Sequence, residues 1–424
     1  MVYLNPFLQF FIGKSAAWGR GTCKEENGRM ETSKNKDDLT VRYAFIQCFF
    51  WMLFGGAIGF VSVYLLDCGF TNTQIGMIIA AAGLFSAIFQ PVIAGYADKE
   101  KSPSLKNLMI LFLVIPMILN ILLLTVYHKS AVFTGGFYAC LLMVMQMLTP
   151  LVNALGMESI NQKKKLNFGV ARGMGSIGYA FVVYVVGVAV GLTGAAALPI
   201  ALLIVSGVLM VGLFLFPFQK VSKLTSETAQ EESRGNPFLF FKQYPRFGIT
   251  LVGCILVYIS HVLLNSFTFQ IVKEKGGGSA EMGTAMAMAS LIELPTMFLF
   301  VFMLKKVRCD IWFRISGIFF FLKTLGTLLA PNIPTFYGVQ IFQMFGWALI
   351  TVSSVYYVNS IMKKQDVIKG QAYMTMTYTL GSVVGALLGG ALIDSLGVTS
   401  MLIFATASAA AGMVIMLFTS QKTR

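Results

Sequence analysis

Three ionisable side chains stand inside long stretches of sequence that are otherwise apolar. Glu293 lies near the middle of one stretch, and Lys323 lies nine residues beyond Arg314 in the next, which is roughly 13 Å of helix at about 1.5 Å per residue. Arg172 stands seven residues beyond Lys165, roughly 10 Å into a third stretch. An ionisable group costs about 2.5–3.5 kcal/mol to place in a membrane span and usually faces a cavity or a partner. These residues are therefore the first candidates for a binding site.

Each of these charges also has a purely structural explanation. Glu293 and Lys323 lie on consecutive stretches and would form a buried ion pair that only fixes helix packing, although ion pairs are a costly way to pack helices. For Arg172 the structural explanation is that its long side chain extends to the membrane surface and keeps the charge in water. Small residues flank Arg172, however, and they allow close helix contact or leave open space beside the guanidinium. These residues are Gly169, Gly173, Gly175 and Gly178.

Neutral polar side chains at membrane depth extend the candidate site. They are Asn153, His261, Asn265, Gln270 and Gln343, and each would equally form an interhelical hydrogen bond. Tyr179 lies two helical turns beyond Arg172 on the same face, so a ring and a guanidinium point the same way. Hydrogen-bond donors beside an aromatic ring suit the recognition of a sugar, and they would equally hold a nucleoside or a carboxylate.

The composition indicates that lipid surrounds this chain. Hydrophobic residues make up 56% of the 424 residues and charged residues 12%, whereas a soluble domain carries about 25% charged residues. The net charge of +14 does not indicate nucleic-acid binding, because Lys and Arg lie in short clusters between apolar runs. A basic balance is expected of an inner-membrane protein, whose cytoplasmic loops retain Lys and Arg.

Twelve apolar runs are long enough to cross a membrane, which takes roughly 20 residues each. The expected spans are 43–66, 74–97, 106–127, 132–156, 168–191, 195–216, 247–271, 281–304, 312–330, 335–361, 371–393 and 398–419. The sequence therefore predicts an all-α membrane protein with twelve transmembrane helices.

Basic residues alternate between successive loops, which gives the expected spans an orientation. One side holds Lys99, Lys101, Lys106, Lys163, Lys164, Lys165, Lys220, Lys223, Arg234, Lys242, Arg246, Lys305, Lys306, Arg308, Arg314, Lys363, Lys364, Lys369, Lys422 and Arg424. The other side holds only Lys129, Lys273 and Lys275. The positive-inside rule places the basic side, with both termini, in the cytoplasm. We expect a multi-pass protein of the bacterial cytoplasmic (inner) membrane.

The chain is expected to consist of two pseudo-symmetric six-helix bundles, 42–218 and 247–420, joined by a cytoplasmic linker over 219–246. A repeat supports this division, because Ser159 and Lys163 recur 201 residues later as Ser360 and Lys364. Parallel repeats of this kind mark the major facilitator architecture, in which the substrate site lies between the halves near the midplane of the membrane.

The two ends of the chain are expected to lie outside the bundles. Residues 1–41 combine an apolar stretch with a charged, Gly-rich one, and basic residues follow the apolar part instead of preceding it as in a signal peptide. We expect a disordered tail or an over-extended start, with Met30 as a plausible first residue. Residues 421–424 form a short C-terminal tail.

Catalysis and cofactor binding are not expected. The six cysteines include no CxxC pair and no metal-ligand spacing, and most lie in apolar runs. The chain has no P-loop and no HExxH motif, and it has no extramembrane stretch large enough for a catalytic domain. We expect no enzyme, no metal and no cofactor, and ATP-driven transport is disfavoured by the missing P-loop.

Two segments resemble the lactose permease family of oligosaccharide:proton symporters. Leu84-Phe85-Ser86, Phe89-Gln90-Pro91 and Asp98-Lys99 resemble the second span of that family and its following loop. The stretch from Asn167-Phe168-Gly169 through Arg172 to Gly178-Tyr179 resembles its fourth-to-fifth-span region. The resemblance covers most of 43–419 loosely and implies a major facilitator that takes up a sugar with a proton.

The resemblance assigns roles to several residues. Arg172 matches the sugar-binding arginine, and Tyr179 takes the place of the ring that stacks on the sugar. Glu293 matches the eighth-span glutamate that binds sugar and participates in coupling, and Lys323 takes the position of a ninth-span arginine. The loop motif around Asp98 implies a role in gating.

The sequence also departs from the family pattern. Asn153 stands where a carboxylate partner of Arg172 is usual, and Asn265 where a seventh-span aspartate is usual. Gln343 and Gly346 replace the histidine and the proton-carrying glutamate of the tenth span. The standard proton route of the family is therefore not carried over.

The function predicted from these observations is uptake of a small polar solute, most directly a sugar or oligosaccharide, by proton symport and alternating access. Glu293 is the proposed coupling residue, with Lys323 and His261 beside it. Facilitated diffusion or sodium coupling, with Glu293 and Lys323 as a gate, is the competing mechanism. A nucleoside symporter and a multidrug or metabolite exporter of the same fold are the alternative functions. The partners expected are the solute, a proton and the lipid bilayer, with the monomer as the functional unit.

Overall fold

The computed structural model describes residues 38–97, 102–218, 237–363 and 366–423, and Asp38–Arg424 is one compact unit. Most of the expected 1–41 tail, most of the 219–246 linker and Asp98 lie outside the described residues. The domain boundaries therefore stay predictions.

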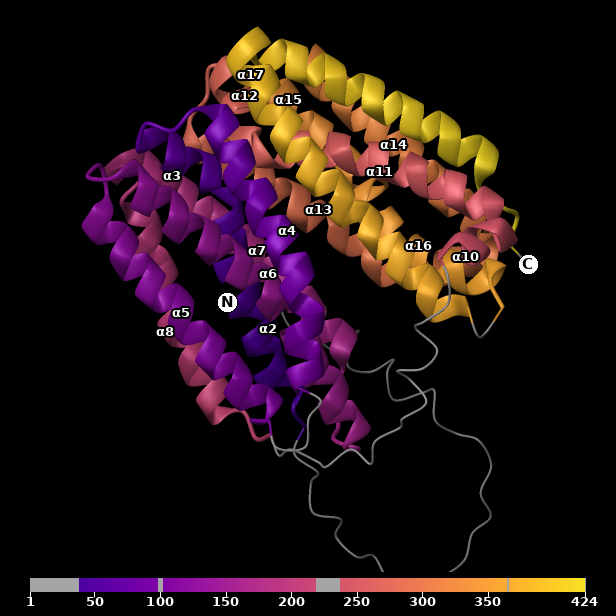
Figure 1. The fold of residues 1–424 in the computed structure, drawn as a ribbon, viewed down its shortest axis with the longest axis horizontal. Helices are drawn as coiled ribbons and strands as arrows, with labels where there is room; N and C mark the ends of the chain where they lie inside the picture. Colours follow the sequence, from indigo (N-terminus) through magenta and orange to yellow (C-terminus); the bar gives the residue numbers. More distant parts are fainter. Residues whose placement is uncertain (1–37, 98–101, 219–236, 364–365, 424) are drawn as a thin grey trace, which may run out of the picture. The chain divides into compact units, whose positions relative to one another are not determined.

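The described residues fold into helices, and no strand occurs among them (Figure 1). The first half contains α2 (Thr40–Gly59), α3 (Val61–Asp67), α4 (Asn72–Ala97), α5 (Leu105–Val126), α6 (Ala131–Asn161), α7 (Phe168–Thr193) and α8 (Ala197–Leu215). The second half contains α10 (Pro237–Gln243), α11 (Pro245–Ser266), α12 (Thr268–Glu274), α13 (Ser279–Lys306), α14 (Cys309–Leu329), α15 (Ile333–Val339), the 3₁₀ helix η3 (Gln340–Met344), α16 (Trp347–Ile361) and α17 (Val367–Thr419).

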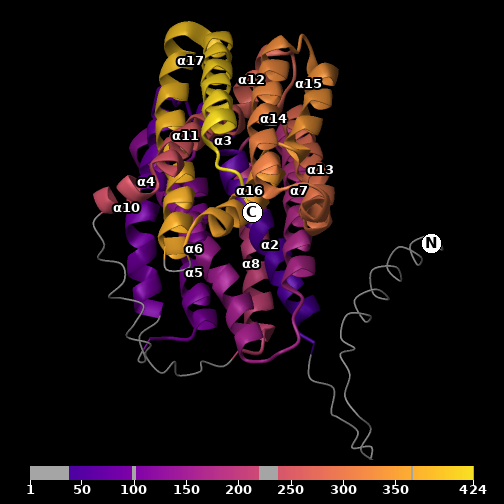
Figure 2. The same ribbon diagram turned by 90° about the vertical axis from the view of Figure 1, so that its right-hand side faces the viewer.

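The prediction of twelve transmembrane helices is confirmed. Eleven helices of the described chain are long and apolar enough to cross a membrane. One of them, α17, has 53 residues and turns at Gly397, where φ is 85°. That left-handed conformation favours glycine, because a Cβ there would be strained. Figure 2 shows the two limbs of α17 lying side by side, so this one helix supplies the eleventh and twelfth spans.

Three expected spans are interrupted instead of continuous. The first continues from α2 into α3 after Phe60, and the seventh continues from α11 into α12 after Phe267. The tenth is divided into α15, η3 and α16. The hydropathy pattern predicts the length of such spans and not these breaks, since every segment on either side of a break remains apolar.

Two ends of the helix assembly are distinguished below by their loops. The basic end carries the 162–167 turn, and the opposite end carries the turns at 68–71, 127–130 and 275–278. At the basic end, Asn167 caps α7 by accepting a hydrogen bond of 3.1 Å from the Val170 amide. Such a cap satisfies a backbone N–H that would otherwise lack a partner at the start of the helix.

The two halves are joined at the opposite end by the carboxylate of Asp394. Asp394 ends the first limb of α17 and accepts hydrogen bonds from the backbone amides of Asn72 (3.1 Å) and Thr73 (2.6 Å) at the start of α4. It also accepts from the side chains of the same two residues, at 2.7 and 2.6 Å. A carboxylate at a helix N-terminus is favourable because it meets free N–H groups and the positive end of the helix dipole.

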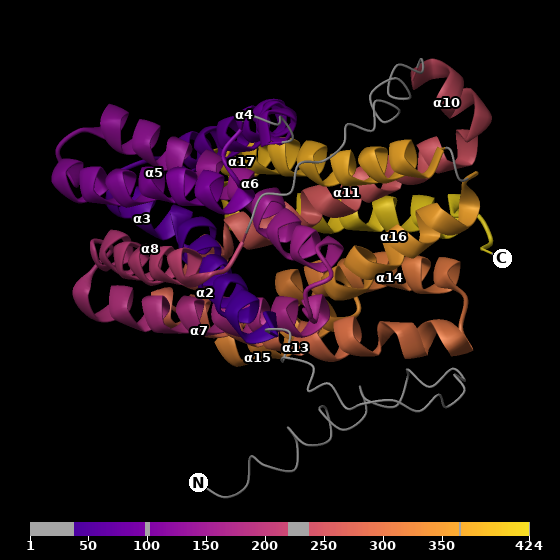
Figure 3. The same cartoon turned by 90° about the horizontal axis from the view of Figure 1, so that it is seen from below.

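Between the Asp394 contact and the basic end, glycines let the helices of the two halves approach each other closely. A Cβ on Gly76 of α4 would overlap the carbonyl oxygen of Ala386 in α17, and one on Gly283 of α13 would overlap that of Val183 in α7. Figure 3 shows α4 alongside α17. Small residues are the usual means of such backbone contact in membranes.

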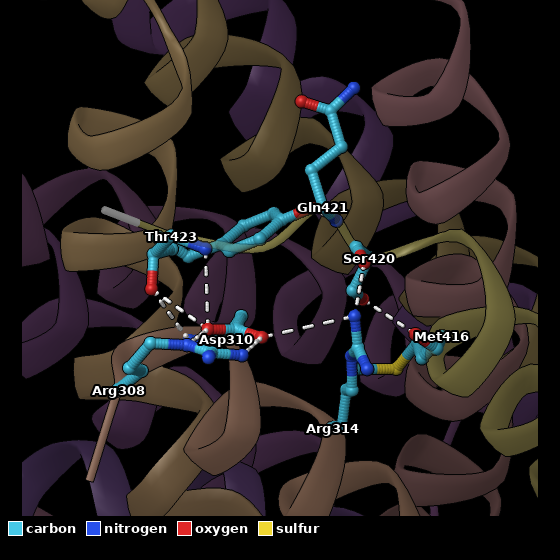
Figure 4. Close-up of polar contacts among 8 residues, drawn as sticks. Arg308, Asp310, Arg314, Met416, Ser420, Gln421 and Thr423 are labelled. Atoms are coloured by element: carbon cyan, nitrogen blue, oxygen red, sulfur yellow. Dashed lines mark hydrogen bonds and ion pairs between the residues drawn. The ribbon is translucent and has the colours of Figure 1, made fainter.

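A second carboxylate fastens the C-terminal residues at the basic end (Figure 4). Asp310, at the start of α14, is fully buried and accepts two hydrogen bonds of 3.0 Å from Arg308. Thr423 donates to the same carboxylate from its amide at 3.2 Å and from its hydroxyl at 2.9 Å. Arg314 donates to the Ser420 carbonyl oxygen at 2.5 Å. The end of α17 is thereby held to α14.

We predict that Asp394→Ala loosens the contact between the halves at the opposite end, because the N-terminus of α4 loses its only carboxylate acceptor among the described residues. Spin labels at Thr71 and Leu396, in a cysteine-free background, report the distance across this contact by double electron–electron resonance. The variant should gain a longer-distance population.

Ser395→Ala is the matched control, since the Ser395 hydroxyl donates only to Ala391 in its own helix. Identical distance distributions in Asp394→Ala and the parent protein would show that the carboxylate does not hold this contact closed.

Candidate functional site

Arg172 lies on α7, where that helix packs against α2. A Cβ on Gly175 would overlap the Trp51 ring, and one on Gly178 would overlap the Cys48 carbonyl oxygen, so α7 presents bare backbone to α2. This close approach brings the guanidinium carbon of Arg172 to 4.1 Å from the centroid of the Trp51 ring. A cation over an indole face is attracted by about 0.5–2 kcal/mol, depending on how far it is desolvated.

The edge of the Arg172 guanidinium remains free for a ligand. Arg172 is half-buried, and among the described residues it forms neither a hydrogen bond nor an ion pair. Its flat face rests on Trp51, which leaves its N–H donors pointing along the plane of the group. A guanidinium held in this way offers a fork that matches a carboxylate or a pair of hydroxyl oxygens.

Trp51 is itself fixed by a chain of hydrogen bonds. Its indole N–H donates to Gln47 Oε1 at 2.9 Å, and Gln47 Nε2 donates to the Tyr43 hydroxyl at 2.6 Å. The Tyr43 hydroxyl donates to the Val152 carbonyl oxygen of α6 at 2.9 Å. Gln47 and Tyr43 are both fully buried. The orientation of the ring under Arg172 therefore depends on contacts that reach α6.

Tyr179 lies two turns further along α7 and packs against Gly55 of α2, where a Cβ would overlap its ring. It follows the same seam between α2 and α7 as Arg172, as its spacing from Arg172 predicts. The ring in contact with the guanidinium, however, is Trp51. A role for Tyr179 in stacking on a solute stays a prediction.

In the second half, Gln343 connects Glu293 to Lys323. Gln343 Nε2 donates to Glu293 Oε1 at 2.7 Å, and Lys323 Nζ donates to Gln343 Oε1 at 2.5 Å. No direct ion pair joins Glu293 to Lys323 in the described part of the chain. The ion pair considered from the sequence is therefore replaced by a bridge in which the amide presents its donor to the carboxylate and its acceptor to the ammonium.

The break in the tenth span positions Gln343. The residue lies in η3, between α15 and α16, and Gly346 has φ −84° and ψ −91° at the start of α16. A short 3₁₀ segment within a longer helix often marks a functional hinge, and interrupted helices form the substrate sites of many transporters. Glu293, Lys323 and Gln343 are 8%, 6% and 5% exposed, so the bridge is buried.

His261 and Asn265 form a second polar group next to this bridge. The His261 ring stacks on Trp347 with 4.2 Å between centroids and 2° between planes. Asn265 Nδ2 donates to the His261 carbonyl oxygen at 2.8 Å. Asn265 and Lys323 also line a cavity of 20 Å³, which has room for about one water molecule.

The packing of α7 on α13 brings Arg172 and Glu293 to similar depth. The Ser290 hydroxyl of α13 donates to the Ser176 carbonyl oxygen of α7 at 3.1 Å. The Phe298 ring lies against Gly173 nearer the basic end. On α13 the two contacts lie on either side of Glu293, and on α7 both lie within about one turn of Arg172, so the two side chains start at similar depth. A solute between the halves could therefore contact both residues.

Other predicted residues lie apart from this arrangement. Asn153 is half-buried on α6 and makes no side-chain hydrogen bond within the described residues. Gln270 is used at the opposite end, where it donates to Asn72 Oδ1 at 2.8 Å. Asp98 lies outside the described residues, so its role in gating stays a prediction.

Sequence reasoning missed Trp51, Gln47 and Trp347. Tyr43, Gln47 and Trp51 follow one another at intervals of four residues, which places polar groups on one face of an apolar helix. That periodicity is a usable signal for the Tyr43–Gln47–Trp51 chain. Trp347 carried no comparable signal, because its partner His261 lies on another span.

Comparison with known proteins identifies the family. The model of the MFS_1 like family matches residues 40–404. No curated protein matches the chain.

Several solved structures of transporters have a similar fold. A variant of the nucleoside transporter NupG has a TM-score of 0.77 at 16% identity, covering 90% of this chain and 99% of its own. NupG itself has a TM-score of 0.75 at 17% identity, covering 91% and 100%. An auto-inhibited POT family peptide transporter has a TM-score of 0.66 at 11% identity, covering 91% and 98%. At these identities the likeness establishes the fold alone.

We predict that Trp51→Leu raises the KM for the transported solute about 2- to 30-fold, the equivalent of the about 0.5–2 kcal/mol of a cation–π contact. The leucine keeps an apolar side chain against Gly175 but gives the guanidinium no ring to rest on. The maximal rate should change less than KM. Trp51→Phe, which keeps a ring face, should recover most of the affinity, and initial uptake rates at varied solute concentration separate the two parameters.

Proposed function

The chain belongs to the MFS_1 like family, and on this premise we propose that it takes up a small hydroxylated solute, a sugar or oligosaccharide, together with a proton. The protein is a multi-pass membrane transporter of the major facilitator type. We place it in the bacterial cytoplasmic membrane with its basic end and both termini in the cytoplasm. All residues of the proposed site belong to one chain, and we propose the monomer as the functional unit.

The free edge of Arg172 is the observation that carries this proposal. A hydroxylated solute offers pairs of oxygen atoms, which a guanidinium fork binds in two parallel hydrogen bonds. On the other half, the Glu293 carboxylate accepts hydrogen bonds from hydroxyl groups and is held in place by Gln343. A solute that contacts both residues would link the halves, which is what alternating access requires.

The positions of the contacts between the halves support an alternating-access cycle. The Asp394 contact with α4 closes the opposite end, and none of its atoms belongs to the candidate solute site. Rocking of one half against the other would break this contact and open the site toward the opposite end, on the side of the membrane away from the basic loops. The close glycine contacts of α4 with α17 and of α7 with α13 would serve as the surfaces on which the halves pivot.

Glu293 is the residue we assign to proton coupling. It is the carboxylate of the described residues that lies at the site, and its acceptor Oε1 is bound by the Gln343 amide. Protonation would weaken this hydrogen bond by removing the negative charge of the acceptor. Gln343 also binds Lys323 and lies at the break of the tenth span. A change in the protonation state of Glu293 would therefore change the hydrogen bonds that hold the tenth span at this break.

A nucleoside is the second candidate solute, and the stacked pair of His261 and Trp347 favours it. A nucleoside carries a flat base as well as a hydroxylated sugar, and a flat aromatic surface with nearby amides is suited to hold a base. A nucleoside transporter is also among the proteins of similar fold.

We predict that Glu293→Gln abolishes uphill solute accumulation driven by a pH gradient and spares solute exchange. Glutamine keeps the size and a carbonyl acceptor for Gln343, but it cannot take up or release a proton. Proteoliposomes loaded with unlabelled solute measure exchange, and empty ones with an imposed pH gradient measure accumulation.

Glu281→Gln is the matched control on the same helix. Glu281 accepts a hydrogen bond of 2.8 Å from the Gly278 amide at the start of α13, a cap that glutamine also provides. Persistent accumulation in Glu293→Gln would exclude Glu293 as the coupling residue.

A further inference from the structure

The charged groups of the site do not balance. Within the described residues, Arg172 and Lys323 are the Arg and Lys side chains of the site and Glu293 is its one carboxylate. Glu293 and Lys323 are linked by the Gln343 amide, so these two opposite charges offset each other. Glu293 also attracts Arg172 electrostatically, so one carboxylate faces two cations and the site keeps one net positive charge.

The surroundings of Arg172 give it a ring and no acceptor. Gln47 Oε1 accepts from Trp51, and the Tyr43 hydroxyl is engaged with Gln47 and with the Val152 carbonyl oxygen. On the side of α13, the Ser176 carbonyl oxygen accepts from Ser290. These groups on α2, α7 and α13 are therefore paired with one another, whereas the guanidinium is held by its face on Trp51.

A guanidinium in this setting is suited to a planar anion. A charge at membrane depth is costly without a counter-charge, and the fork of arginine matches both oxygens of a carboxylate. Hydrogen bonds between two charged groups are also about twice as strong as those between neutral groups. A ligand carboxylate would supply both the missing negative charge and the missing acceptors.

We propose that the transported solute carries a carboxylate that binds Arg172, so that the substrate is a hydroxylated monoanion such as a sugar acid. This inference rests on the proposed function, which it narrows from a polar solute to an anionic one. The hydroxyl groups of the solute would then contact the Glu293 side of the site, where a second carboxylate would be repelled.

The net charge moved in one cycle follows from this substrate class. One monoanion and one proton enter together, so their charges cancel and no net charge crosses the membrane. A neutral solute with one proton would instead carry one positive charge inward and would be driven by a negative interior potential. Uptake of the monoanion should therefore respond to a pH gradient and not to membrane potential.

Full-length protein in proteoliposomes tests the proposal with two matched pairs of probes. These are D-glucose against D-glucuronate, and uridine against uridine 5′-carboxylate, each pair sharing a ring system and differing by a carboxylate. We expect the acid of at least one pair to be taken up under a pH gradient at least about 10-fold more efficiently than its neutral partner, as one lost charge-assisted contact implies. Clamping the potential with valinomycin and potassium should not change the rate.

Arg172→Gln should remove the preference for the acid, and Arg172→Lys should keep part of it, because the charge survives without the fork. Arg42→Gln is the matched control, since Arg42 is exposed at the basic end of α2 in the same half. Its preference should equal that of the parent protein. The level of folded protein in the membrane is measured for every variant, and the ratio of acid to neutral uptake is independent of that level.

Three results would overturn the inference. They differ in whether they also contradict the proposed function. Uptake of the neutral probe alone, with a measurable inward current, excludes an anionic substrate and leaves the proposed sugar or nucleoside symport intact. An unchanged preference in Arg172→Gln excludes Arg172 as the binding residue. Absence of proton-driven uptake for all four probes contradicts the proposed function as well.

Discussion

A charged group inside a membrane is stable only where the protein supplies what water would otherwise provide, and this requirement explains most of the polar contacts described above. At the ends of the helices the same need is met for Asp310 by Arg308 and Thr423, and the exposed carboxylate of Asp394 accepts from the free amides at the start of α4. Glu293 and Lys323 reach each other through Gln343. In each case the charge ties together segments that are distant in sequence, so the compensation of charge and the assembly of the helices are one problem.

Arg172 meets the same requirement differently. An aromatic face attracts the cation but leaves its hydrogen-bonding edge unused, and the ring itself is held by Gln47 and Tyr43. The result is a rigid support with a free donor edge, which is the usual form of a binding residue and not of a structural ion pair. The bridge on the other half is more deeply buried and has fewer free groups. In the proposed mechanism the two halves contribute unequal parts, with a solute-binding cation on the first and a coupling carboxylate on the second.

The proposed movement between the halves depends on a different set of contacts. The helices that cross between them meet through backbone at Gly76 and Gly283, where a side chain would prevent the approach. Contacts of this kind are close but involve few interlocking side chains, and polar contacts at Asp394 and between Gln270 and Asn72 add side-chain attachments at one end. The interruption of the tenth span lies next to the carboxylate that we assign to the proton.

Much of the fold could be predicted from the sequence because the signals that determine it are local. Hydropathy gives the length of each span and the alternation of Lys and Arg gives its direction, and neither depends on which helix lies beside which. The same local reading identified Arg172, Glu293 and Lys323 as charges at membrane depth. It also detected the turn between the last two spans, where Gly397 lies.

The partner of each charge was decided only by the tertiary structure. Gln343 lies between Glu293 and Lys323 because the tenth span breaks at that depth, and Trp51 lies under Arg172 because glycines on α7 admit α2. Such pairings depend on the rotation of each helix about its axis and on its depth relative to its neighbours. A shift of one residue turns a side chain by about 100° around a helix of 3.6 residues per turn, so sequence spacing on separate spans cannot fix which groups meet.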